Sequence, residues 1–405
     1  MNIVIIGAGV GGLAAAHGLL AAGHEVAVYE RGATLRTGGT GLILWSNGTG
    51  VLDYLDVPMH DLGSPLTAVD TAFSDGVGLW QVDMHRIEKH YEQPNLVIPR
   101  GDIVRRLAER LPAGVLRLGM SCTGFEEGST DRPVALFEDG SRIEADLLIG
   151  ADGNRSAIRR QLTGDETRNW TGFATWHGLD PIDLELASGT TGMTIYGPEG
   201  FSVLLPAGGG RLQWVFETPW KDGELVPPGA VGDSSAAPLD STDPAAIVNN
   251  LRSRFGHWAE PIPSVLAAIE NSEIGLFPHI RLQPPQPWSR GRVTMLGDAV
   301  HAIPPALAQG VNQVLEDVWV LCGQFGPDTV TGDPATVASA LAGYEDICRR
   351  RLRHLDRYAA VMAKGIAPPK FLRHTRFPVT WIQTHTLRML SDYLKDEARP
   401  PALTR

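Results

Sequence analysis

The pattern of apolar and polar residues predicts that the chain begins with a strand, a helix and a second strand. Residues 3–6, "IVII", form a continuous apolar run, which is typical of a strand buried on both faces of a parallel sheet. The next stretch, "GVGGLAAAHGLLAAG" (9–23), has the spacing of small and apolar residues that favours a helix. Residues 25–30, "EVAVYE", then predict a second strand.

The same pattern of buried strand and helix returns further along the chain. Residues 106–111, "RLAERL", predict a helix. The stretch "VALFEDGSRIEADLLIGADG" (134–153) predicts a hairpin that turns at Asp139-Gly140 and is followed by a buried strand. After residue 290, "RVTML" predicts a strand and "GVNQVLEDVWVLCGQF" (310–325) a helix, and a helical tail is expected over 336–395.

Between these regions, apolar and polar residues alternate. Alternation over "FATWHGL" (173–179) and "GMTIYGPEGFSVLLPAGGGRLQWVFE" (192–217) predicts antiparallel strands, with a hairpin turn at "AGGG" (207–210). Residues 222–243 are rich in Pro, Gly, Ser and Asp, which predicts a long surface loop. A helical pattern resumes with "PAAIVNNLRSRFGHW" (244–258).

A glycine-rich motif, G-x-G-x-x-G, lies between the first strand and the first helix. Gly7 permits the tight turn, Gly9 lets the backbone approach a pyrophosphate, and Gly12 allows close packing of helix on strand. The helix N-terminus offers free N–H groups to phosphates. Glu30 ends the second strand, where an acid accepts hydrogen bonds from a ribose, and Arg31 follows it as a further candidate. With its strand, helix and acid, the motif predicts dinucleotide binding but does not distinguish NAD from FAD.

These elements predict an α/β fold with a Rossmann-like dinucleotide-binding domain, an inserted antiparallel-sheet substrate domain and a helical C-terminal tail. The dinucleotide-binding domain is expected to be discontinuous and to comprise 1–73, 97–172 and 277–365. The substrate-binding sheet domain is expected to comprise 74–96 and 173–276. Residues 366–405 are expected to form the C-terminal helical segment.

The composition is that of an ordinary soluble globular protein. Of 405 residues, 43% are hydrophobic and 20% charged, and the length allows two domains with a sizeable core. The net charge of -11 argues against a nucleic-acid-binding surface and says little about a small substrate. The three cysteines lie far apart without a CxxC, so we expect no disulfide framework, no metal site and a reducing cytoplasm.

Neither a signal peptide nor an integral membrane segment is expected. The chain starts directly with a strand-like run, and no stretch reaches the roughly 18 apolar residues of a spanning helix. The amphipathic segment "TWIQTHTLRMLSDYLKDEA" (380–398) favours a docked helix over a membrane anchor. The sequence leaves open whether the protein is a monomer or a homodimer.

Two further acids follow buried strands. Asp152, in "GADGNRSAIRR" (150–160), has three arginines close behind it, and Asp298 follows "RVTML". Strand ends in α/β sheets face the ligand crevice, where a carboxylate can accept hydrogen bonds from sugar-like hydroxyls. Pro304-Pro305 make the chain rigid where it turns, and Gly310 begins a helix whose first N–H groups favour an adjacent negative charge.

The three motifs together resemble those of the single-component FAD-dependent aromatic hydroxylases, the para-hydroxybenzoate hydroxylase-like flavoprotein monooxygenases. The resemblance covers the G-x-G-x-x-G motif with its acid, the "GADG" segment and the "GD" segment with its "PP…QG" continuation, in matching order along nearly the whole chain. It implies an FAD site in which the ADP part is held by Gly7, Gly9, Gly12 and Glu30, and the phosphates also by Arg100 of "IPRGDIVRRL". Asp152 would serve both FAD and NAD(P)H, and Asp298 would bind the ribityl chain. The flavin N1–C2=O edge would lie against Gly310, Val311 and Asn312.

The resemblance also implies the reaction. NADPH or NADH would reduce the flavin, which would capture O2 as a C4a-hydroperoxide and hydroxylate or epoxidise a small aromatic or heteroaromatic substrate, in natural-product or aromatic metabolism. The flavin would carry the difficult chemistry, while the protein supplies orientation, electrostatics and exclusion of water. Because only one dinucleotide fingerprint is visible, NAD(P)H is expected to bind transiently along the outer cleft.

Three positions depart from the pattern of the family. The chain has "AQG" (308–310) where the family often reads "GQG", "SN" (46–47) in place of "PN", and "WHG" (176–178) in place of "W-R-G". These differences weaken any transfer of a substrate or of flavin mobility, but they leave the FAD-binding residues intact.

The candidates for catalysis and substrate binding are less specific. His177, Tyr196 and Pro304 are the catalytic candidates, with His279 and His301 as further histidines to consider. For His301 a packed or hydrogen-bonded role is favoured. An apolar pocket able to stack an aromatic ring is expected from aromatic side chains on the alternating strands and from the segment after residue 40. Its candidate residues are Trp45, Asn47, Trp176, Phe201 and Trp214, for which plain core packing is the rival interpretation.

Other functions on the same scaffold are retained as alternatives. An FAD-dependent dehydrogenase or reductase would pass hydride to its substrate without inserting oxygen. A non-catalytic flavin-binding protein would hold FAD and a ligand without turnover. A flavin-dependent halogenase is disfavoured because the chain has no W-x-W-x-I-P motif.

Overall fold

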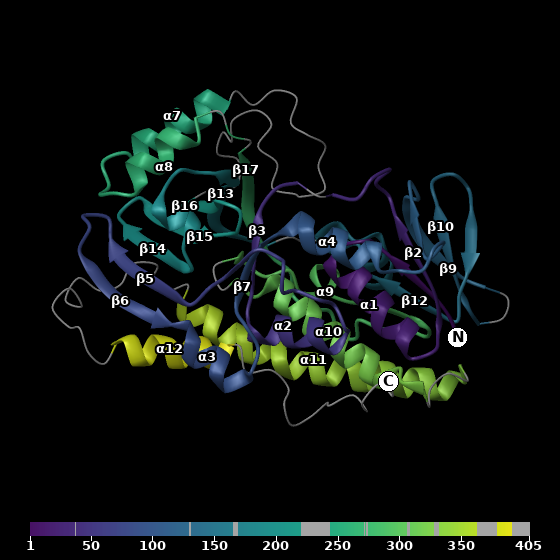
Figure 1. Ribbon diagram of the computed structural model, residues 1–405. Helices are drawn as coiled ribbons and strands as arrows, with labels where there is room; N and C mark the ends of the chain where they lie inside the picture. The colour runs from purple at the N-terminus through teal and green to yellow at the C-terminus, as the bar shows by residue number, and fades with distance from the viewer. Residues whose placement is uncertain are drawn as a thin grey trace.

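The computed structural model describes most residues of the chain. They are 1–36, 38–128, 131–164, 169–219, 244–270, 272, 274–305, 308–327, 332–362 and 379–390. The predicted loop at 222–243 lies outside them. Figure 1 shows two sheet regions side by side, one near the N-terminus and one covered by α7 and α8, with long helices beneath.

A parallel sheet of five strands forms the centre of the first region. Its strands have the order β18-β12-β1-β2-β8 and are β1 (Asn2–Ile6), β2 (Glu25–Glu30), β8 (Leu116–Leu118), β12 (Leu147–Gly150) and β18 (Val293–Met295). All neighbouring pairs are parallel. The apolar runs of β1 and β12 are buried almost throughout, as expected of strands covered on both faces. The sheet therefore joins segments that lie almost 300 positions apart in the sequence.

Helices cover this parallel sheet and share its core. They are α1 (Val10–Ala21), α4 (Arg100–Glu109), α5 (Ala157–Thr163), α9 (Asp298–His301), α10 (Gly310–Gln324) and α11 (Pro334–Met362), with the short 3-10 helix η1 (Gly153–Arg155). Helix α10 packs against α1, α2 and α11, and its side chains from Leu315 to Cys322 are all buried. A hydrophobic core formed by the sheet and these helices is the largest in the molecule.

Two smaller antiparallel sheets flank the parallel one. The first has the order β11-β10-β9 and is formed by β9 (Cys122–Glu127), β10 (Pro133–Phe137) and β11 (Arg142–Glu144). The hairpin predicted at Asp139-Gly140 connects β10 to β11, and Gly140 has a φ of +84°. The second has the order β3-β7-β4 and is formed by β3 (Gly41–Leu44), β4 (Ser64–Pro65) and β7 (Leu96–Pro99), with α2 (Ser46–Tyr54) and α3 (Met84–Tyr91) nearby.

The second region is a seven-stranded sheet of order β17-β13-β16-β15-β14-β5-β6. Its strands are β5 (Ala68–Phe73), β6 (Gly78–Asp83), β13 (Asn169–Pro181), β14 (Thr191–Gly197), β15 (Gly200–Pro206), β16 (Arg211–Pro219) and β17 (Gly275–Arg281), and the short helix α6 (Glu185–Ser188) precedes β14. All pairs are antiparallel except β14 with β5. The turn predicted at "AGGG" joins β15 to β16.

One face of the seven-stranded sheet is closed by two helices. Helices α7 (Pro244–Phe255) and α8 (Ile262–Ala268) pack on it and form a second core with the apolar residues of that face (Figure 1). The opposite face is turned toward the parallel-sheet region. Gln213 on this face donates through Nε2 to the Thr40 hydroxyl at 2.8 Å, and its Oε1 accepts from the Gly41 amide.

Strand pairing conflicts with three of the predicted domain boundaries, since β13 of the seven-stranded sheet already begins at Asn169 and crosses the one between 172 and 173. Strand β5 pairs with β14 inside the seven-stranded sheet, so a boundary after residue 73 would separate it from its partners. Strand β17 begins at residue 275, before the predicted boundary at 277. The division of the chain into domains otherwise stays a prediction.

The C-terminal segment is described in part. Helix α12 (Val379–Leu390) packs against β6 and α3, where the Tyr91 hydroxyl donates to the Arg388 carbonyl at 2.8 Å. The docked helix expected here is thus confirmed for the described residues. Among the described helices, none has both the length and the apolar character needed to cross a membrane.

Candidate functional site

Four strand ends meet at one edge of the parallel sheet. Gly7 follows β1, Glu30 ends β2, Asp152 follows β12, and Asp298 follows β18. Because these strands are parallel neighbours, their carboxyl ends lie along the same edge, which is where α/β sheets bind ligands. The structure therefore brings together the three motifs that were singled out in the sequence.

The glycine-rich loop has the geometry of a phosphate-binding turn. Gly7 has a φ of +107°, and a Cβ there would collide with the Ala151 carbonyl oxygen. A Cβ at Gly12 would collide with the Gly7 carbonyl oxygen. A Cβ at Gly9 would meet nothing within 4 Å, and no side chain caps the N-terminus of α1 at this residue. Open space beside uncapped helix N–H groups fits a pyrophosphate.

Glu30 is held in place at the end of β2 by backbone amides. Its Oε2 accepts from the Ala8 amide at 2.9 Å, and its Oε1 accepts from the Gly32 amide at 3.0 Å. These bonds orient the carboxylate beside the glycine loop, where a ribose hydroxyl could share it. Arg31, the next residue, is exposed.

Asp152 connects the end of β12 to helix α5. Its Oδ2 accepts from the Ala157 amide at 2.7 Å and the Ile158 amide at 3.4 Å, at the N-terminus of α5. Its Oδ1 is buried and has no hydrogen-bond partner among the described residues. Burial raises the pKa of Asp152, although hydrogen bonds from Ser156 and the α5 amides oppose the shift. The unpaired oxygen is a free acceptor at the edge where a dinucleotide would lie.

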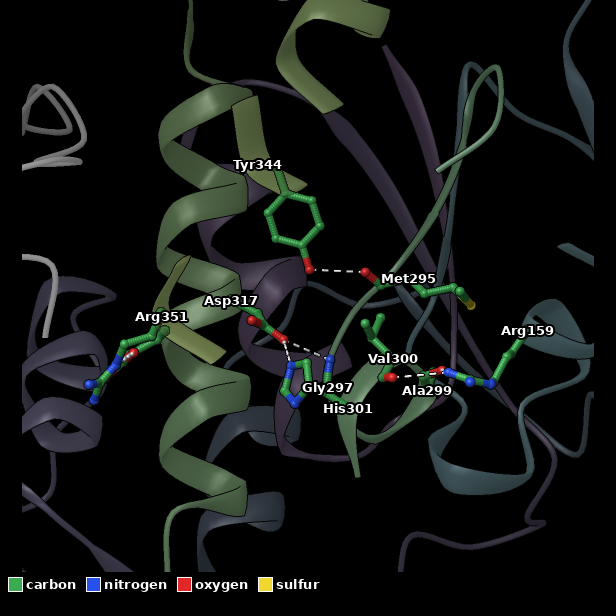
Figure 2. A network of polar contacts seen from close by, with 10 residues as sticks. Arg159, Met295, Gly297, Ala299, Val300, His301, Asp317, Tyr344 and Arg351 are labelled. Atoms are coloured by element: carbon green, nitrogen blue, oxygen red, sulfur yellow. Dashed lines mark hydrogen bonds and ion pairs between the residues drawn. The ribbon is translucent and has the colours of Figure 1, made fainter. Parts of the chain in front are cut away.

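The loop that presents Asp298 is anchored by Asp317 of α10 (Figure 2). Asp317 Oδ2 accepts from the Gly297 amide at 2.8 Å and lies 2.6 Å from His301 Nε2. Burial alone would lower the pKa of His301, but the charge of Asp317 and the hydrogen bond to it raise the pKa above its ordinary value. His301 is thus a packed, hydrogen-bonded residue, as expected. Asp298 itself is exposed at the start of α9.

Two further contacts hold the same segment from other sides (Figure 2). The guanidinium of Arg159 donates to the carbonyls of Ala299 and Val300 at 3.2 and 2.9 Å. The Tyr344 hydroxyl donates to the Met295 carbonyl at 2.9 Å. Strand β18 and helix α9 are therefore braced by α5, α10 and α11, which presets the position of Asp298.

At the start of α10, the backbone of Gly310 has open space beside it, and the side chain of Asn312 fixes the first turn by hydrogen bonds. A Cβ at Gly310 would meet nothing within 4 Å, and no side chain caps the helix at Gln309. The Asn312 side chain accepts from the Trp45 amide at 3.0 Å and donates to the carbonyls of Ile43 and Ala308 at 3.0 and 2.9 Å. This side chain is thus committed to structure, so Asn312 could meet a flavin edge only through its backbone.

The remaining FAD candidates lie at the same region. Val311 is partly buried against the main core. Arg100 begins α4, and its amide donates to the Thr40 carbonyl at 2.9 Å. Burial, and next the charge of Arg100, lower the pKa of His177 to about 4. Arg100 is thus close enough to the seven-stranded sheet for its charge to act on His177.

Two of the predicted substrate residues point away from the candidate site. Trp176 and Trp214 lie on the face of the seven-stranded sheet that α7 and α8 cover, where both belong to the second hydrophobic core. Trp214 is fully buried, and its Nε1 donates to Asp180 Oδ2 at 2.7 Å. The assignment of these two tryptophans to the pocket was wrong. Alternation in a strand separates two faces, but it does not show which face is turned toward the site and which is covered by helices.

Trp45 and Asn47 are also occupied by packing. Trp45 lies in a buried cluster between the two sheet regions, where its Nε1 has no hydrogen-bond partner among the described residues. Asn47 is fully buried and donates to Glu316 Oε1 at 2.7 Å and to Gln309 Oε1 at 3.2 Å. Glu316 in turn accepts from the Arg351 guanidinium at 2.8 Å. Asn47 therefore ties α2 to α10, and its role in substrate binding stays a prediction.

The other predicted residues lie on the face turned toward the parallel-sheet region. Phe201 and Tyr196 are paired across β14 and β15, with ring centroids 5.8 Å apart. His177 is on the same face, since it lies two residues from Thr175, whose β16 partner is Glu217. Pro304 is half-buried in the segment between α9 and α10. A catalytic role for His177, Tyr196 or Pro304 stays a prediction.

A buried polar cluster on this face joins His279, one of the histidines considered in the sequence, to Thr175 and Glu217, which the sequence did not single out. The Thr175 hydroxyl lies 2.6 Å from His279 Nε2, and Glu217 Oε2 lies 3.4 Å from the same nitrogen. Burial raises the pKa of Glu217 to about 8 and lowers the pKa of His279 to about 3. The signal available in the sequence was the placement of Thr175 and of Glu217 next to aromatic residues in "ATWH" and "QWVFE", which puts them on the strand face opposite those rings.

Comparisons with known proteins identify the family of the chain. Residues 1–355 match the family described as FAD binding domain. The 3-amino-4-hydroxybenzoate 2-monooxygenase of Streptomyces cremeus is 32% identical over 379 residues, which are 91% of this chain and 88% of that protein. The FAD-dependent urate hydroxylase of Klebsiella pneumoniae is 30% identical over 359 residues, 88% of each chain.

Solved structures show the same architecture. The crystal structure of Klebsiella pneumoniae HpxO complexed with FAD and uric acid has a TM-score of 0.83 and 26% identity, and the match covers 96% of each chain. The 2,6-dihydroxypyridine-3-hydroxylase from Arthrobacter nicotinovorans has the same fold, with a TM-score of 0.75 at 20% identity and coverage of 90% of this chain and 92% of that one.

Proposed function

This chain belongs to the FAD binding domain family and is an FAD-dependent monooxygenase, and we propose that it hydroxylates a small aromatic or heteroaromatic ring with NADPH or NADH as reductant. The observation that carries the proposal is the meeting of four strand ends with the uncapped start of α10, opposite an aromatic-bearing face of a second sheet. Relatives that act on an aminohydroxybenzoate and on urate support a planar aromatic or heteroaromatic substrate.

The residues around the strand ends fit FAD. Gly7, Gly9 and Gly12 would admit the pyrophosphate, and Glu30 would accept from the adenosine ribose. Asp298, exposed on its braced loop, would bind the ribityl hydroxyls. When bound, FAD supplies the redox and oxygen-transfer chemistry.

The protein's own residues would do the positioning. The first N–H groups of α10 would lie beside the pyrimidine edge of the ring system and favour negative charge there by about 0.3–1 kcal/mol. Phe201 and Tyr196 would stack against the substrate ring and keep water out of the site. Burial raises the pKa of Tyr196 to about 12, so its hydroxyl keeps its proton at neutral pH and can donate to the substrate.

Turnover with labelled oxygen tests the proposed function. The purified FAD-bound protein is supplied with NADPH or NADH and a panel of aromatic and heteroaromatic ligands under isotopically labelled O2. We expect one ligand class to accelerate NAD(P)H oxidation and to yield a product that carries one labelled oxygen atom. Oxidised product without label would instead establish a dehydrogenase or reductase. A flavin that NAD(P)H fails to bleach with any ligand would indicate a flavin-binding protein without turnover.

The assignment of Asp298 has its own test. Asp298→Ala is expected to lose FAD on gel filtration, because the carboxylate is the exposed acceptor on the braced loop after β18. Asp346→Ala, which removes a surface ion pair with Arg350 on α11, is the matched control and should keep its FAD. FAD retention equal to that of the control would contradict the assignment.

A further inference from the structure

We propose that Glu217, backed by Thr175 and His279, is the specificity-determining residue of the substrate pocket, and that it selects a ring substituent that is neutral and bears a proton, such as a hydroxyl, an amine or a ring N–H. A substrate that presents a carboxylate at this point would be rejected. This inference rests on the proposed function, since it assigns the substrate class of the same site.

The strand register places Glu217 within a row of aromatic residues. Glu217 pairs with Phe201 of β15 on one side and with Thr175 of β13 on the other. Tyr196 follows beyond Phe201, and Phe277 follows beyond Thr175. Because directly paired residues project from the same face of a sheet, the carboxyl group lies in a line of rings suited to contact a planar aromatic molecule.

The sheet face that carries this row is turned toward the proposed FAD-binding region. Gln213 and Glu217 lie four residues apart on β16 and therefore on the same face. Gln213 contacts Thr40 and Gly41, which precede and begin β3. The cluster thus lies on the inner side of the seven-stranded sheet, and a second core with α7 and α8 closes the outer side.

The cluster is neutral near pH 7. Burial raises the pKa of Glu217 to about 8, although a hydrogen bond from Thr175 opposes the shift, and burial lowers the pKa of His279 to about 3. Glu217, Thr175 and His279 are each at most 5% exposed. A protonated carboxyl can donate one hydrogen bond and accept another, so it matches a substituent that does the same.

The electrostatics of the cluster disfavour an anionic substituent. A carboxylate brought against the neutral Glu217 would carry a charge into a buried site, and that charge would raise the pKa of Glu217 further. Burying an unpaired charge is expensive, whereas a neutral hydroxyl or amine would gain hydrogen bonds at no such cost. The cluster therefore predicts a preference for neutral substituents, with a ligand affinity that changes at the pH where Glu217 ionises.

Among the described residues, the other groups of this face with a shifted pKa do not ionise in the same pH range. The pKa of Tyr196 is raised to about 12 by burial and next by the charge of Glu217, and burial lowers the pKa values of His177 and His279 to about 4 and 3. Arg100, whose charge acts on His177, stays protonated throughout. A change in ligand affinity near pH 8 can consequently be assigned to Glu217.

Ligand binding to the FAD-bound enzyme tests the proposal. The probes are phenol, aniline and benzoate, and the flavin absorbance change reports the affinity of each between pH 6 and pH 9, a range of about three units around the pKa of Glu217. We expect the enzyme to prefer phenol and aniline over benzoate by roughly tenfold or more. The phenol affinity should change with a midpoint near pH 8.

Two variants separate recognition from structure. Glu217→Gln, which is isosteric, should keep the preference for the neutral ligands and lose the midpoint near pH 8. Glu217→Ala should lose the preference itself. Glu270→Gln, at a carboxylate on the outer side that pairs with Arg252, is the matched control and should behave as the parent enzyme.

The outcomes decide between the two proposals. If Glu217→Gln retains the midpoint near pH 8, or if folded Glu217→Ala keeps the parent preference for phenol and aniline over benzoate, the role of Glu217 is refuted. FAD content and NAD(P)H-driven bleaching are measured in the same samples. Their absence in the parent enzyme would overturn the proposed function, whereas their presence with unchanged ligand preference would overturn only this inference.

Discussion

Ala308 lies in a backbone conformation that usually belongs to glycine. Its φ is +49°, in the left-handed region, which costs an L-residue with a Cβ about 1–2 kcal/mol. This is the position at which related hydroxylases often have glycine, and its carbonyl accepts from Asn312 at the start of α10. The extra methyl group therefore adds strain at the segment that would lie beside the flavin.

A substitution series at this residue measures the strain. Ala308→Gly should leave the free energy of unfolding unchanged or raise it by up to about 1 kcal/mol, because relief of strain offsets the greater freedom of glycine in the unfolded chain. Ala308→Val should lower it by more than about 1 kcal/mol, because a β-branched residue tolerates this φ poorly. In the control Ala338→Gly, at an exposed helical site in α11, a loss of about 1 kcal/mol is expected. Urea unfolding gives all three values, and equal losses in both glycine variants would show that Ala308 is unstrained.

At the scale of elements, the first turn of α10 is tied to β3 by one side chain. Asn312→Ala would leave the Trp45 amide and the carbonyls of Ile43 and Ala308 without this partner in a buried environment. We expect the free energy of unfolding to fall by roughly 2–4 kcal/mol and FAD retention to weaken, since the helix start would shift. Asn249→Ala, at an exposed site in α7, should change neither quantity. A loss below about 1 kcal/mol for Asn312→Ala would mean that the helix start is held by other contacts.

The pairing of His301 with Asp317 makes the brace between α9 and α10 sensitive to pH. The pKa of His301 is raised in the folded protein, so the pair contributes stability that is fully present below the unfolded value of about 6.5. That contribution is lost as the pH rises through the folded pKa. Asp317→Asn removes the charge that raises this pKa. The difference in unfolding free energy between parent and variant should therefore be largest in mildly acidic buffer and shrink as the pH rises. A difference that does not change between pH 5 and pH 9, about four units around the unfolded pKa, would contradict this expectation.

An element could be predicted from the sequence where its pattern of apolar residues shows which of its faces are buried. Strands β1, β12 and β18 are buried on both faces, and a continuous apolar run followed by glycine or an acid identifies both the strand and the ligand-facing end. Gly7, Asp152 and Asp298 could therefore be placed at one site from the sequence. The seven-stranded sheet has two different covered faces, so alternation identified its strands but not the direction in which Trp176 and Trp214 point.

The polar cluster of the second sheet depends on register, which a single sequence does not reveal. Thr175 and His279 are separated by 104 positions and meet because β13 pairs with β17 at Thr175 and Phe277. Glu217 reaches them through a different pairing, that of β13 with β16. Neither pairing leaves a motif in the sequence, whereas the FAD-binding residues follow local turns and strand ends that do.

At the scale of the whole molecule, the candidate site lies between two sheets that come from interleaved segments of the chain. The parallel sheet presents strand ends, and the seven-stranded sheet presents its inner face to them. Gln213 joins the two, through Thr40 and Gly41 just before and at the start of β3. Exclusion of water from the space between the sheets should depend on this contact, because oxygen chemistry in a solvated site releases peroxide without forming product.

Gln213→Leu tests whether the contact between the sheets couples reduction to hydroxylation. The variant keeps the volume of the side chain and removes its hydrogen bonds to Thr40 and Gly41, which should lower the free energy of unfolding by roughly 1–3 kcal/mol. FAD should stay bound, since none of its predicted ligands is altered, but the peroxide released per NAD(P)H consumed should rise. Gln81→Leu, which removes a bond of 2.8 Å to Asp70 at the exposed edge of the same sheet, is the control and should leave peroxide release unchanged. If Gln213→Leu loses stability while its peroxide yield equals that of the control, the two sheets stay closed over the substrate without this contact, and water must be excluded by the apolar residues around Trp45 instead.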